Sequence, residues 1–237
     1  MVPVRPASTV VLLREHDGRL ETLLLKRNKA LLFAGGFWVF PGGAIDDGDR
    51  AAAGGDPDRA ARLAAAREAW EEAGVAADPE TMVSLSHWTT PAVEKRRFAT
   101  WFFAAPLAAD AEVTIDHGEI HEARWLGLGE ALAAHAAGAL NLMPPTYITL
   151  LNLVRYRDLA GVLAAEARSP VPRVEPVLGR EGERPVTLYP GDAAYAGGDP
   201  AAAGPRHRCV LEGRQWIYQC SDLPEECVPL VARGLSP

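Results

Sequence analysis

Three glutamates lie in one short stretch of this sequence at the spacing of a single helical turn. Glu68, Glu71 and Glu72 are three and four positions apart, so in a helix their carboxylates share one face. Three like charges at that distance repel one another, and a hard divalent cation would compensate the repulsion. Oxygen donors alone favour Mg²⁺ or Mn²⁺ over zinc. The spacing therefore indicates a divalent-metal site, and the alternative is an acidic helix face exposed to solvent.

The segment that carries these glutamates has the composition of a helix. Residues 58–73 are rich in alanine, arginine and glutamate and include no proline. Asp56 is a suitable N-cap, Pro57 suits the first helical position, and Gly74 suits the left-handed residue that ends a helix. The sequence therefore predicts a helix over 58–73, with Trp70 buried beside the acidic cluster.

The elements around this helix follow from hydrophobic patterning and turn residues. Phe40-Pro41-Gly42-Gly43 ends a short strand, and its glycines let the backbone approach a ligand closely. Residues 46–57 are predicted to form a loop rich in Gly and Asp. Strands are expected at 8–14, 20–27, 37–40, 82–90, 97–105, 123–126, 185–189, 207–212 and 214–219, and further helices at 129–137 and 145–167. Strand-rich halves around a helix predict a mixed α/β or α+β sandwich.

Composition limits the classes of partner. The 237 residues are 48% apolar and 23% charged, enough for one large domain or one domain with an appendage. The net charge of -7 gives no basic stripe for a nucleic acid polymer. No apolar run reaches the roughly 18 residues of a membrane span, and the first residues lack a signal-peptide pattern. We therefore expect a cytoplasmic protein with no membrane partner.

The cysteines are confined to the C-terminal part. Cys209, Cys220 and Cys227 are an odd number, which favours a reducing compartment over a disulfide framework. His207 lies close by in the sequence and raises the alternative of a zinc site. The spacing matches none of the paired Cys-x-x-Cys patterns, so ordinary thiols are the favoured interpretation.

The glycine turn and the acidic helix together resemble the Nudix box. That pattern is Gly, five residues, Glu, seven residues, then Arg-Glu-apolar-x-Glu-Glu-x-Gly-apolar, and its second half matches residues 67–75. Counted from Gly43, the first glutamate of the pattern falls on Asp49. Seventeen residues, 50–66, follow where the family has seven. We therefore expect an insertion at about 50–59, and the role of Asp49 stays open.

The resemblance implies a fold and a division of the chain. The fold would be a Nudix-like α/β/α sandwich with a mixed central sheet, in the α/β (α+β) class. The Nudix domain would cover residues 1–167, with the box at 43–75. Residues 168–237 would form a C-terminal extension with helical and β-hairpin elements, packed on the same domain.

The resemblance also implies roles for the residues of the box. Glu68, Glu71 and Glu72 would hold Mg²⁺ or Mn²⁺, and Arg67 would orient a glutamate through a charge-assisted hydrogen bond. A further carboxylate from a downstream loop often completes such sites, and Glu119 lies in the right region as metal ligand or general base. The expected catalytic residues are then Arg67, Glu68, Glu71 and Glu119. For Glu119 the alternative is an acid in a solvated turn.

Other segments resemble one branch of the family, the peroxisomal coenzyme A diphosphatase-like proteins with a long insertion in the box. These segments are 23–28, 87–91, 96–103 and 143–146. The substrate-binding candidates are Arg27, Gly42, Gly43, Arg96 and Arg97. Surface charge is the alternative for the three arginines, because planar guanidinium groups bind phosphate but also line exposed strands.

The function implied is metal-dependent hydrolysis of the diphosphate linkage of a nucleoside diphosphate derivative. Coenzyme A or acyl-coenzyme A is favoured, followed by nucleotide sugars, ADP-ribose and dinucleotides. The partner would be a small-molecule diphosphate, and a homodimer is one arrangement the sequence allows. One alternative is a non-catalytic Nudix-fold protein that binds such a ligand for regulation, and another is an interaction module whose helix is merely acidic.

Overall fold

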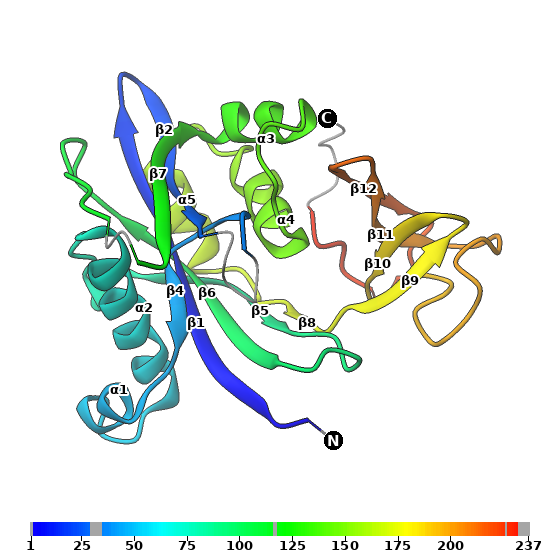
Figure 1. Cartoon of the computed structure of the whole chain (residues 1–237), viewed down its shortest axis with the longest axis horizontal. Coiled ribbons are helices and arrows are strands. Elements are labelled where there is room, and N and C mark those ends of the chain that lie inside the picture. Colours follow the sequence, from blue (N-terminus) through cyan, green and yellow to red (C-terminus); the bar gives the residue numbers. More distant parts are fainter. Residues whose placement is uncertain (1, 29–34, 116–117, 226, 232–237) are drawn as a thin grey trace.

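The computed structural model describes residues 2–28, 35–115, 118–225 and 227–231. Within them, a mixed eight-stranded sheet forms the main body and a four-stranded antiparallel sheet forms the C-terminal part (Figure 1). The main sheet consists of β1 (Val4–His16), β2 (Arg19–Arg27), β3 (Trp38–Val39), β4 (Gly42–Ala44), β5 (Val83–Thr89), β6 (Arg97–Pro106), β7 (Ile120–Gly127) and β8 (Arg173–Val174). The helices are α1 (Asp47–Ala52), α2 (Pro57–Ala73), α3 (Leu128–Ala136), α4 (Pro144–Leu153) and α5 (Leu159–Glu166), with a 3₁₀ turn, η1 (Pro79–Thr81).

The centre of the main sheet is β1. It runs parallel to β6 and antiparallel to β2 and β4, and the full order is β3-β2-β1-β6-β5-β8, with β4 on β1 and β7 on β2. Residues 10–13 of β1 are all fully buried, because helices cover both faces of the sheet. The helix α2 covers one face, and α3 and α4 cover the other (Figure 1).

The helix α2 has the boundaries and caps expected from the sequence. The Asp56 side chain accepts hydrogen bonds from the first turn, and Gly74 ends the helix in the left-handed conformation with φ of 66°. Small side chains on its inner face permit close packing on the sheet; they are Ala61, Ala64, Ala65, Ala69 and Ala73. The prediction that Trp70 is buried is wrong. Its position on the helix is opposite this alanine face, and it is 62% exposed.

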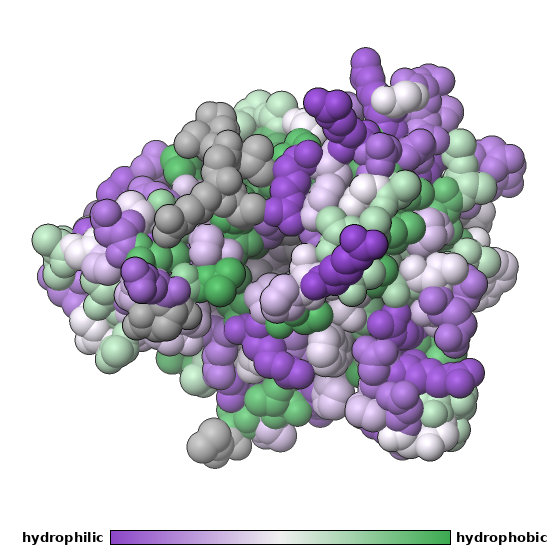
Figure 2. Space-filling view, turned by 180° about the vertical axis from the view of Figure 1, so that it is seen from behind, coloured by the Kyte–Doolittle hydropathy of each residue, from purple (hydrophilic) through white to green (hydrophobic). Residues whose placement is uncertain are grey.

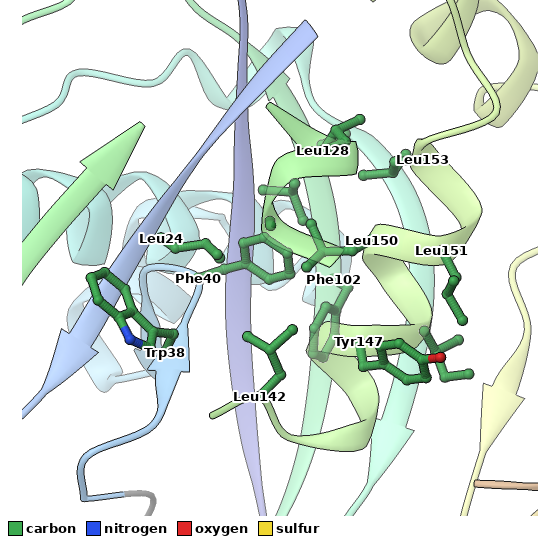
Figure 3. Close-up of a cluster of buried hydrophobic side chains, with 14 of the residues drawn as sticks. Leu24, Trp38, Phe40, Phe102, Leu128, Leu142, Tyr147, Leu150, Leu151 and Leu153 are labelled. Atoms are coloured by element: carbon green, nitrogen blue, oxygen red, sulfur yellow. The ribbon is translucent and has the colours of Figure 1, made fainter. Parts of the chain in front are cut away.

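The opposite face of the sheet carries the larger core. Figure 3 shows Leu24 of β2, Phe102 of β6 and Phe40, which lies between β3 and β4, packed against Leu128 of α3 and Leu150 of α4. The apolar residues of β1 thus alternate between two cores, with Val11 and Leu13 in this one and Val10 and Leu12 beneath α2.

Two predicted segments differ from the structure. The loop expected at 46–57 contains the helix α1, which begins with a capping box in which Asp46 and Asp49 each accept from the other's backbone N–H. The single helix expected at 145–167 is two helices, because the Asp158 side chain accepts from the N–H of Gly161 at 2.7 Å and starts α5 as a new helix.

The C-terminal part begins by extending the main sheet. The strand β8 pairs with β5, and the second sheet has the order β12-β11-β10-β9. Its strands are β9 (Val177–Glu181), β10 (Arg184–Leu188), β11 (Arg206–Glu212) and β12 (Gln215–Ser221). Tyr189 and Cys209 from this part are fully buried in the same core as Leu150 of α4. The two sheets therefore share apolar packing, and β12 contacts both α3 and α4.

The cysteines and His207 lie in different surroundings. Cys209 is buried, Cys220 is exposed and Cys227 is half-buried, and all three are free thiols. The two ring nitrogens of His207 contact the Pro190 carbonyl oxygen at 2.6 Å and the Leu230 N–H at 3.1 Å. The imidazole therefore joins two backbone segments.

In the part of the chain that the structure describes, no helix is long and apolar enough to cross a membrane.

Candidate active site

The three glutamates of α2 differ in their exposure. The side chain of Glu72 is 8% exposed, that of Glu68 is 15% exposed and that of Glu71 is 54% exposed. Each is placed by helical periodicity, because positions 68 and 72 face the sheet edge at β4 and position 71 faces outward. The acidic face therefore has a buried side against the glycine turn and an open side toward solvent.

The glycines of β4 bring the backbone against these carboxylates. The N–H of Gly42 donates to Glu72 Oε2 at 3.0 Å. A Cβ atom at Gly43 would collide with the Glu68 carboxylate, and one at Gly42 would collide with the backbone of Ser8 and the side chain of Thr9. At Gly42 a side chain would meet the backbone of β1, so only glycine fits there, and at Gly43 any side chain would displace the Glu68 carboxylate.

Arg67 lies among the acidic groups and contacts several of them. Its Nη1 lies 2.9 Å from both Glu68 Oε1 and Glu71 Oε2. Its Nη2 donates to the Ala44 carbonyl oxygen at 3.0 Å. The guanidinium therefore forms charge-assisted hydrogen bonds with two of the three glutamates.

Asp49 completes the surroundings of Arg67. Its two carboxylate oxygens accept from Arg67 Nε at 3.2 Å and from Nη2 at 3.0 Å. The Asp49 side chain is 6% exposed and is held by α1. This hydrogen bond is the largest cause of the raised pKa of Arg67. Sequence reasoning left Asp49 without a role, although its count from Gly43 and its place in the Asp46 capping box were signals that could have assigned one.

Arg27 and Glu119 join the cluster from the neighbouring strands. At the end of β2, Arg27 Nη2 lies 2.9 Å from Glu119 Oε2, and its Nη1 lies 3.7 Å from Glu72 Oε1. Pairing of β2 with β7 brings Glu119, which is distant in sequence, to this point. Among the described residues, the buried Nε of Arg27 has no hydrogen-bond partner. One donor of this guanidinium is therefore unused.

Arg96 and Arg97 lie elsewhere. Arg97 is buried, and its Nη2 contacts Glu175 Oε1 at 2.5 Å, while Arg96 is exposed just before β6. The strand register places Arg97 opposite Val4 and places Trp101 opposite Ser8, the neighbour of Gly43. Along β6, Arg97 is four residues, roughly 13 Å, from Trp101. Trp101 is the residue of β6 that lies level with Gly43 across the sheet.

The electrostatic environment raises the proton affinity of the two buried glutamates. Burial is the largest cause and raises the pKa of Glu72 to about 8, although the Gly42 N–H and Arg27 act in the other direction. Burial also raises the pKa of Glu68, and the effect of Arg67 only partly opposes it. Glu119 adds to the repulsion at both carboxylates. This site is short of positive charge.

These residues fit a hard divalent cation in their chemistry. The donors are all carboxylate oxygens, which Mg²⁺ and Mn²⁺ prefer, and the raised pKa values of Glu68 and Glu72 are those of groups that a cation would stabilise in the ionised form. As they stand, no three acidic, histidine or cysteine side chains within the described ranges are arranged to hold an ion. Arg67 instead contacts two of the glutamates.

A separate cavity lies on the other side of the sheet. It has a volume of about 340 Å³ and lies between β5, α4 and the segment 228–230, with Trp88, Ile148 and Leu230 in its lining. Trp88 and Ile148 belong to the core beneath α3 and α4. The back of the molecule is hollowed near its centre, with hydrophobic and hydrophilic side chains interspersed (Figure 2). The acidic cluster is on the α2 face, so this cavity is not part of it.

Comparisons with known proteins identify the family. A NUDIX domain model matches residues 3–144. The putative nudix hydrolase 7 of Caenorhabditis elegans is 28% identical over 189 residues, which cover 65% of this chain and 62% of that protein. An RNA pyrophosphohydrolase of Cereibacter sphaeroides is 31% identical over 134 residues, 47% of this chain and 76% of that protein.

A solved structure confirms the fold. The NUDIX hydrolase from Alicyclobacillus acidocaldarius matches with a TM-score of 0.64 and 23% identity, covering 72% of this chain and 100% of that one. The mixed central sheet between helical layers is thus the sandwich that the sequence predicted. With more than half of its length matched by the domain model, this chain belongs to the Nudix hydrolase family.

Proposed function

We propose that this protein is a metal-dependent hydrolase that cleaves the diphosphate linkage of a nucleoside diphosphate derivative, with coenzyme A or acyl-coenzyme A favoured. The observation that carries the proposal is the convergence of Glu68, Glu71 and Glu72 with Arg27 and Glu119 at one end of the sheet. Membership of the Nudix hydrolase family supports the reaction class. The likeness of segments 23–28 and 87–91 to one branch of that family supports the substrate.

In this proposal each residue has a defined task. Glu68, Glu71 and Glu72 hold Mg²⁺ or Mn²⁺, which when bound polarises a phosphoryl oxygen of the substrate. Arg67 fixes the orientation of Glu68 and Glu71 through its Nη1. Gly42 and Gly43 leave the space beside the carboxylates free of side chains.

Arg27 and Glu119 act on the substrate and the attacking water. The guanidinium of Arg27, whose side chain is 17% exposed, binds a phosphate oxygen, and its positive charge offsets the negative charge of the diphosphate. Glu119, whose side chain is 58% exposed, accepts the proton of the attacking water at Oε. The water oxygen bonds to phosphorus, the bond from phosphorus to the bridging oxygen breaks, and the second phosphate leaves.

A panel of substrates tests the proposal. Purified protein is incubated with Mg²⁺ or Mn²⁺ and coenzyme A, ADP-ribose, NADH, nucleoside triphosphates or a short 5′-triphosphorylated RNA, and products are separated by chromatography. We expect metal-dependent cleavage with coenzyme A or its acyl derivatives preferred. Preference for the RNA would contradict the small-molecule assignment. It would instead indicate an RNA pyrophosphohydrolase, which is how the Cereibacter relative is named.

The variant Glu71→Gln tests the role of the acidic cluster. We expect its rate to fall at least ~100-fold, because removing one charged ligand forfeits several kcal/mol of transition-state stabilisation. Glu80→Gln is the control, since Glu80 is an exposed acid in η1, and it should keep full activity. Unchanged turnover in Glu71→Gln would remove Glu71 from the site.

A regulatory protein that binds the ligand without hydrolysis is the second candidate. One observation favours it, because seventeen residues stand between Asp49 and Arg67 where the family pattern has seven. The two functions separate in the same experiment. A ligand bound tightly and recovered intact in the presence of Mg²⁺ and Mn²⁺ supports the regulator, and split products support the enzyme.

A further inference from the structure

The cavity between β5 and α4 has walls from segments that are far apart in the sequence. Trp88 of β5 and Ile148 of α4 contribute to two of the walls, and the segment 228–230 forms a third. The volume of about 340 Å³ falls within the range of small-molecule sites, about 300–1,000 Å³. The cavity lies on the face of the main sheet that α3 and α4 cover, whereas the acidic cluster lies on the α2 face. It is therefore a separate candidate site.

The strand β5 is irregular where it lines the cavity. Ser84 and Ser86 pair with two consecutive residues of β6, Phe103 and Phe102. Leu85 is therefore an extra residue with no counterpart in β6, which makes it a β-bulge. Because of the bulge, Leu85 and Ser86 both line the cavity, although consecutive residues of a regular strand point to opposite faces. The bulge thus adds a large apolar side chain to the wall.

The wall formed by the segment 228–230 is held by hydrogen bonds from three elements. This segment passes between α4 and the second sheet (Figure 1). The N–H of Leu230 lies 3.1 Å from both His207 Nε2 and the Tyr218 hydroxyl oxygen. The carbonyl oxygen of Leu230 accepts from Asn152 Nδ2 of α4, and the next residue, Val231, is buried. This wall is therefore part of the packed fold.

The neutral polar groups of the lining have partners within the fold. The Ser86 hydroxyl oxygen accepts from the Trp88 indole N–H at 3.0 Å. The hydroxyls of Thr149 and Ser169 each donate to the backbone carbonyl four residues earlier, at 2.8 and 3.0 Å. The Asn152 amide donates to the segment 228–230. The lining therefore has little need of hydrogen bonds from a ligand.

The charged groups of the lining cancel each other. Arg155 Nη2 lies 3.0 Å from Glu166 Oε1, and the Tyr156 hydroxyl donates to the same oxygen at 2.6 Å. The lining residues thus carry one positive and one negative charge and no surplus of either. A charged ligand would lose its hydration in this cavity without gaining a counter-charge. The walls therefore favour an uncharged ligand.

We propose that this cavity binds an uncharged, largely apolar small molecule with the volume of about two aromatic rings. Leu85, Trp88 and Ile148 supply the apolar contacts. The inference goes beyond the proposed function, because the cavity is separate from the acidic cluster and its ligand is neither the substrate nor the metal. A bound ligand contacts β5, α4 and the segment 228–230 together, so it also stabilises the attachment of this segment to the main body.

Fluorescence titration with two dyes of the same skeleton tests the proposal. N-phenyl-1-naphthylamine is uncharged, whereas 1-anilinonaphthalene-8-sulfonate carries one negative charge, and both become brighter in apolar surroundings. We expect the neutral dye to bind at one saturable site with a Kd of about 10 μM. The sulfonate should bind at least ~10-fold more weakly, because its charge has no partner in the cavity.

Substitutions in the lining locate the bound dye. Leu85→Trp fills part of the cavity and should weaken binding of the neutral dye at least ~10-fold. Val228→Asp introduces a charge at a lining residue that is 80% exposed and should weaken binding about 3-fold. The matched control is Val93→Asp, since Val93 is 77% exposed and lies outside the lining, and it should leave the Kd unchanged. Because Val228 is at the surface, its variant keeps the test valid if Leu85→Trp fails to fold.

Thermal unfolding provides a second measurement. The neutral dye at about ten times its Kd should raise the midpoint of the wild-type protein by about 3 °C and leave that of Leu85→Trp unchanged. Absence of saturable binding, tighter binding of the sulfonate, or equal affinity in the wild type and Val228→Asp would each overturn the inference. A dye signal that falls as the protein concentration rises would also overturn it, because a second copy of the chain would then occupy the cavity.

Discussion

Two regions of this molecule bury charged side chains, and they do so in different ways. In the C-terminal sheet, Arg208 and Asp192 are completely buried and joined by two hydrogen bonds of 2.6 and 2.7 Å. Burial alone would raise the pKa of Asp192, but the hydrogen bonds from Arg208 and the backbone outweigh it and lower the pKa. In the acidic cluster of α2, by contrast, burial is the larger effect and raises the pKa of Glu72 to about 8.

The difference lies in the number of partners. Asp192 accepts from Arg208 and from the N–H groups of His207 and Ala194, so its buried oxygens are satisfied within the fold. In the acidic cluster, several carboxylates share Arg67 and Arg27. A balanced pair stabilises the fold by itself, whereas a surplus of buried negative charge is maintained at a cost and is typical of a site that binds a cation.

The largest expected effect breaks the balanced pair. Asp192→Ala leaves Arg208 buried without its main counter-charge, which should lower the free energy of unfolding by about 3 kcal/mol. Chemical denaturation followed by tryptophan fluorescence measures this change. Glu181→Gln is the control, because its carboxylate lies at a longer 3.5 Å from Arg208, and it should cost less than about 1 kcal/mol. Equal effects of the two variants would contradict the assignment of Asp192 as the essential partner.

The sequence predicts the parts of the site that depend on local structure. The helix α2 has its signals within a few residues, since Asp56, Pro57 and Gly74 mark its ends, and helical periodicity alone places the three glutamates on one face. The exposure of Trp70 is not predictable from its apolar character, because large apolar residues usually face the core. In this helix the core positions are occupied by alanines, and the tryptophan lies on the opposite face, exposed to solvent.

The sequence does not predict contacts made by distant segments. Arg27 and Glu119 meet through the pairing of β2 with β7, at a separation of 92 residues, and no local pattern specifies that register. Arg97 resembles a substrate-binding arginine, yet its partner Glu175 comes from beyond α5, 78 residues away. Asp49 lies at the border of an insertion, where counting along the sequence is least reliable, and only the folded α1 shows that it pairs with Arg67.

An intermediate effect is expected from weakening that pair. Asp49→Asn keeps the shape of the side chain but removes the charge that holds Arg67, so Glu68 and Glu71 should be less well oriented. We expect kcat for the proposed hydrolysis to fall about 10-fold, the lower end for groups that support metal ligands, with little change in KM. Asp47→Asn, an exposed acid in the same helix, is the matched control. A parallel loss in both variants would indicate damage to α1 rather than to the orientation of Arg67.

Rescue by a longer acid separates positioning from folding. Asp49→Glu restores the charge at the place where the family pattern has glutamate, and it should recover part of the activity lost in Asp49→Asn. Thermal unfolding of the variants provides the second measurement, because a purely structural role would lower the midpoint and the activity together. Retained activity in Asp49→Asn at full stability would show that Arg67 needs no partner from α1.

The smallest expected effect concerns pH and the C-terminal region. Burial lowers the pKa of His207, although its contact with the Pro190 carbonyl and the charge of Asp192 oppose the shift. The folded protein therefore binds a proton at His207 less readily than the unfolded chain does. This contribution is constant above the unfolded value of about 6.5 and declines as the pH falls below it.

The slope for one proton cannot exceed about 1.4 kcal/mol per pH unit, so the change is modest beside that of Asp192→Ala. Denaturation at pH 7.5 and 5.5 measures it, and His207→Gln should reduce the difference between the two pH values whatever its effect on absolute stability. His16→Gln, which removes an exposed histidine in β1, should leave the difference unchanged. An equal pH dependence in the wild type and His207→Gln would assign the acid sensitivity to other histidines, of which His135 is also buried with a lowered pKa.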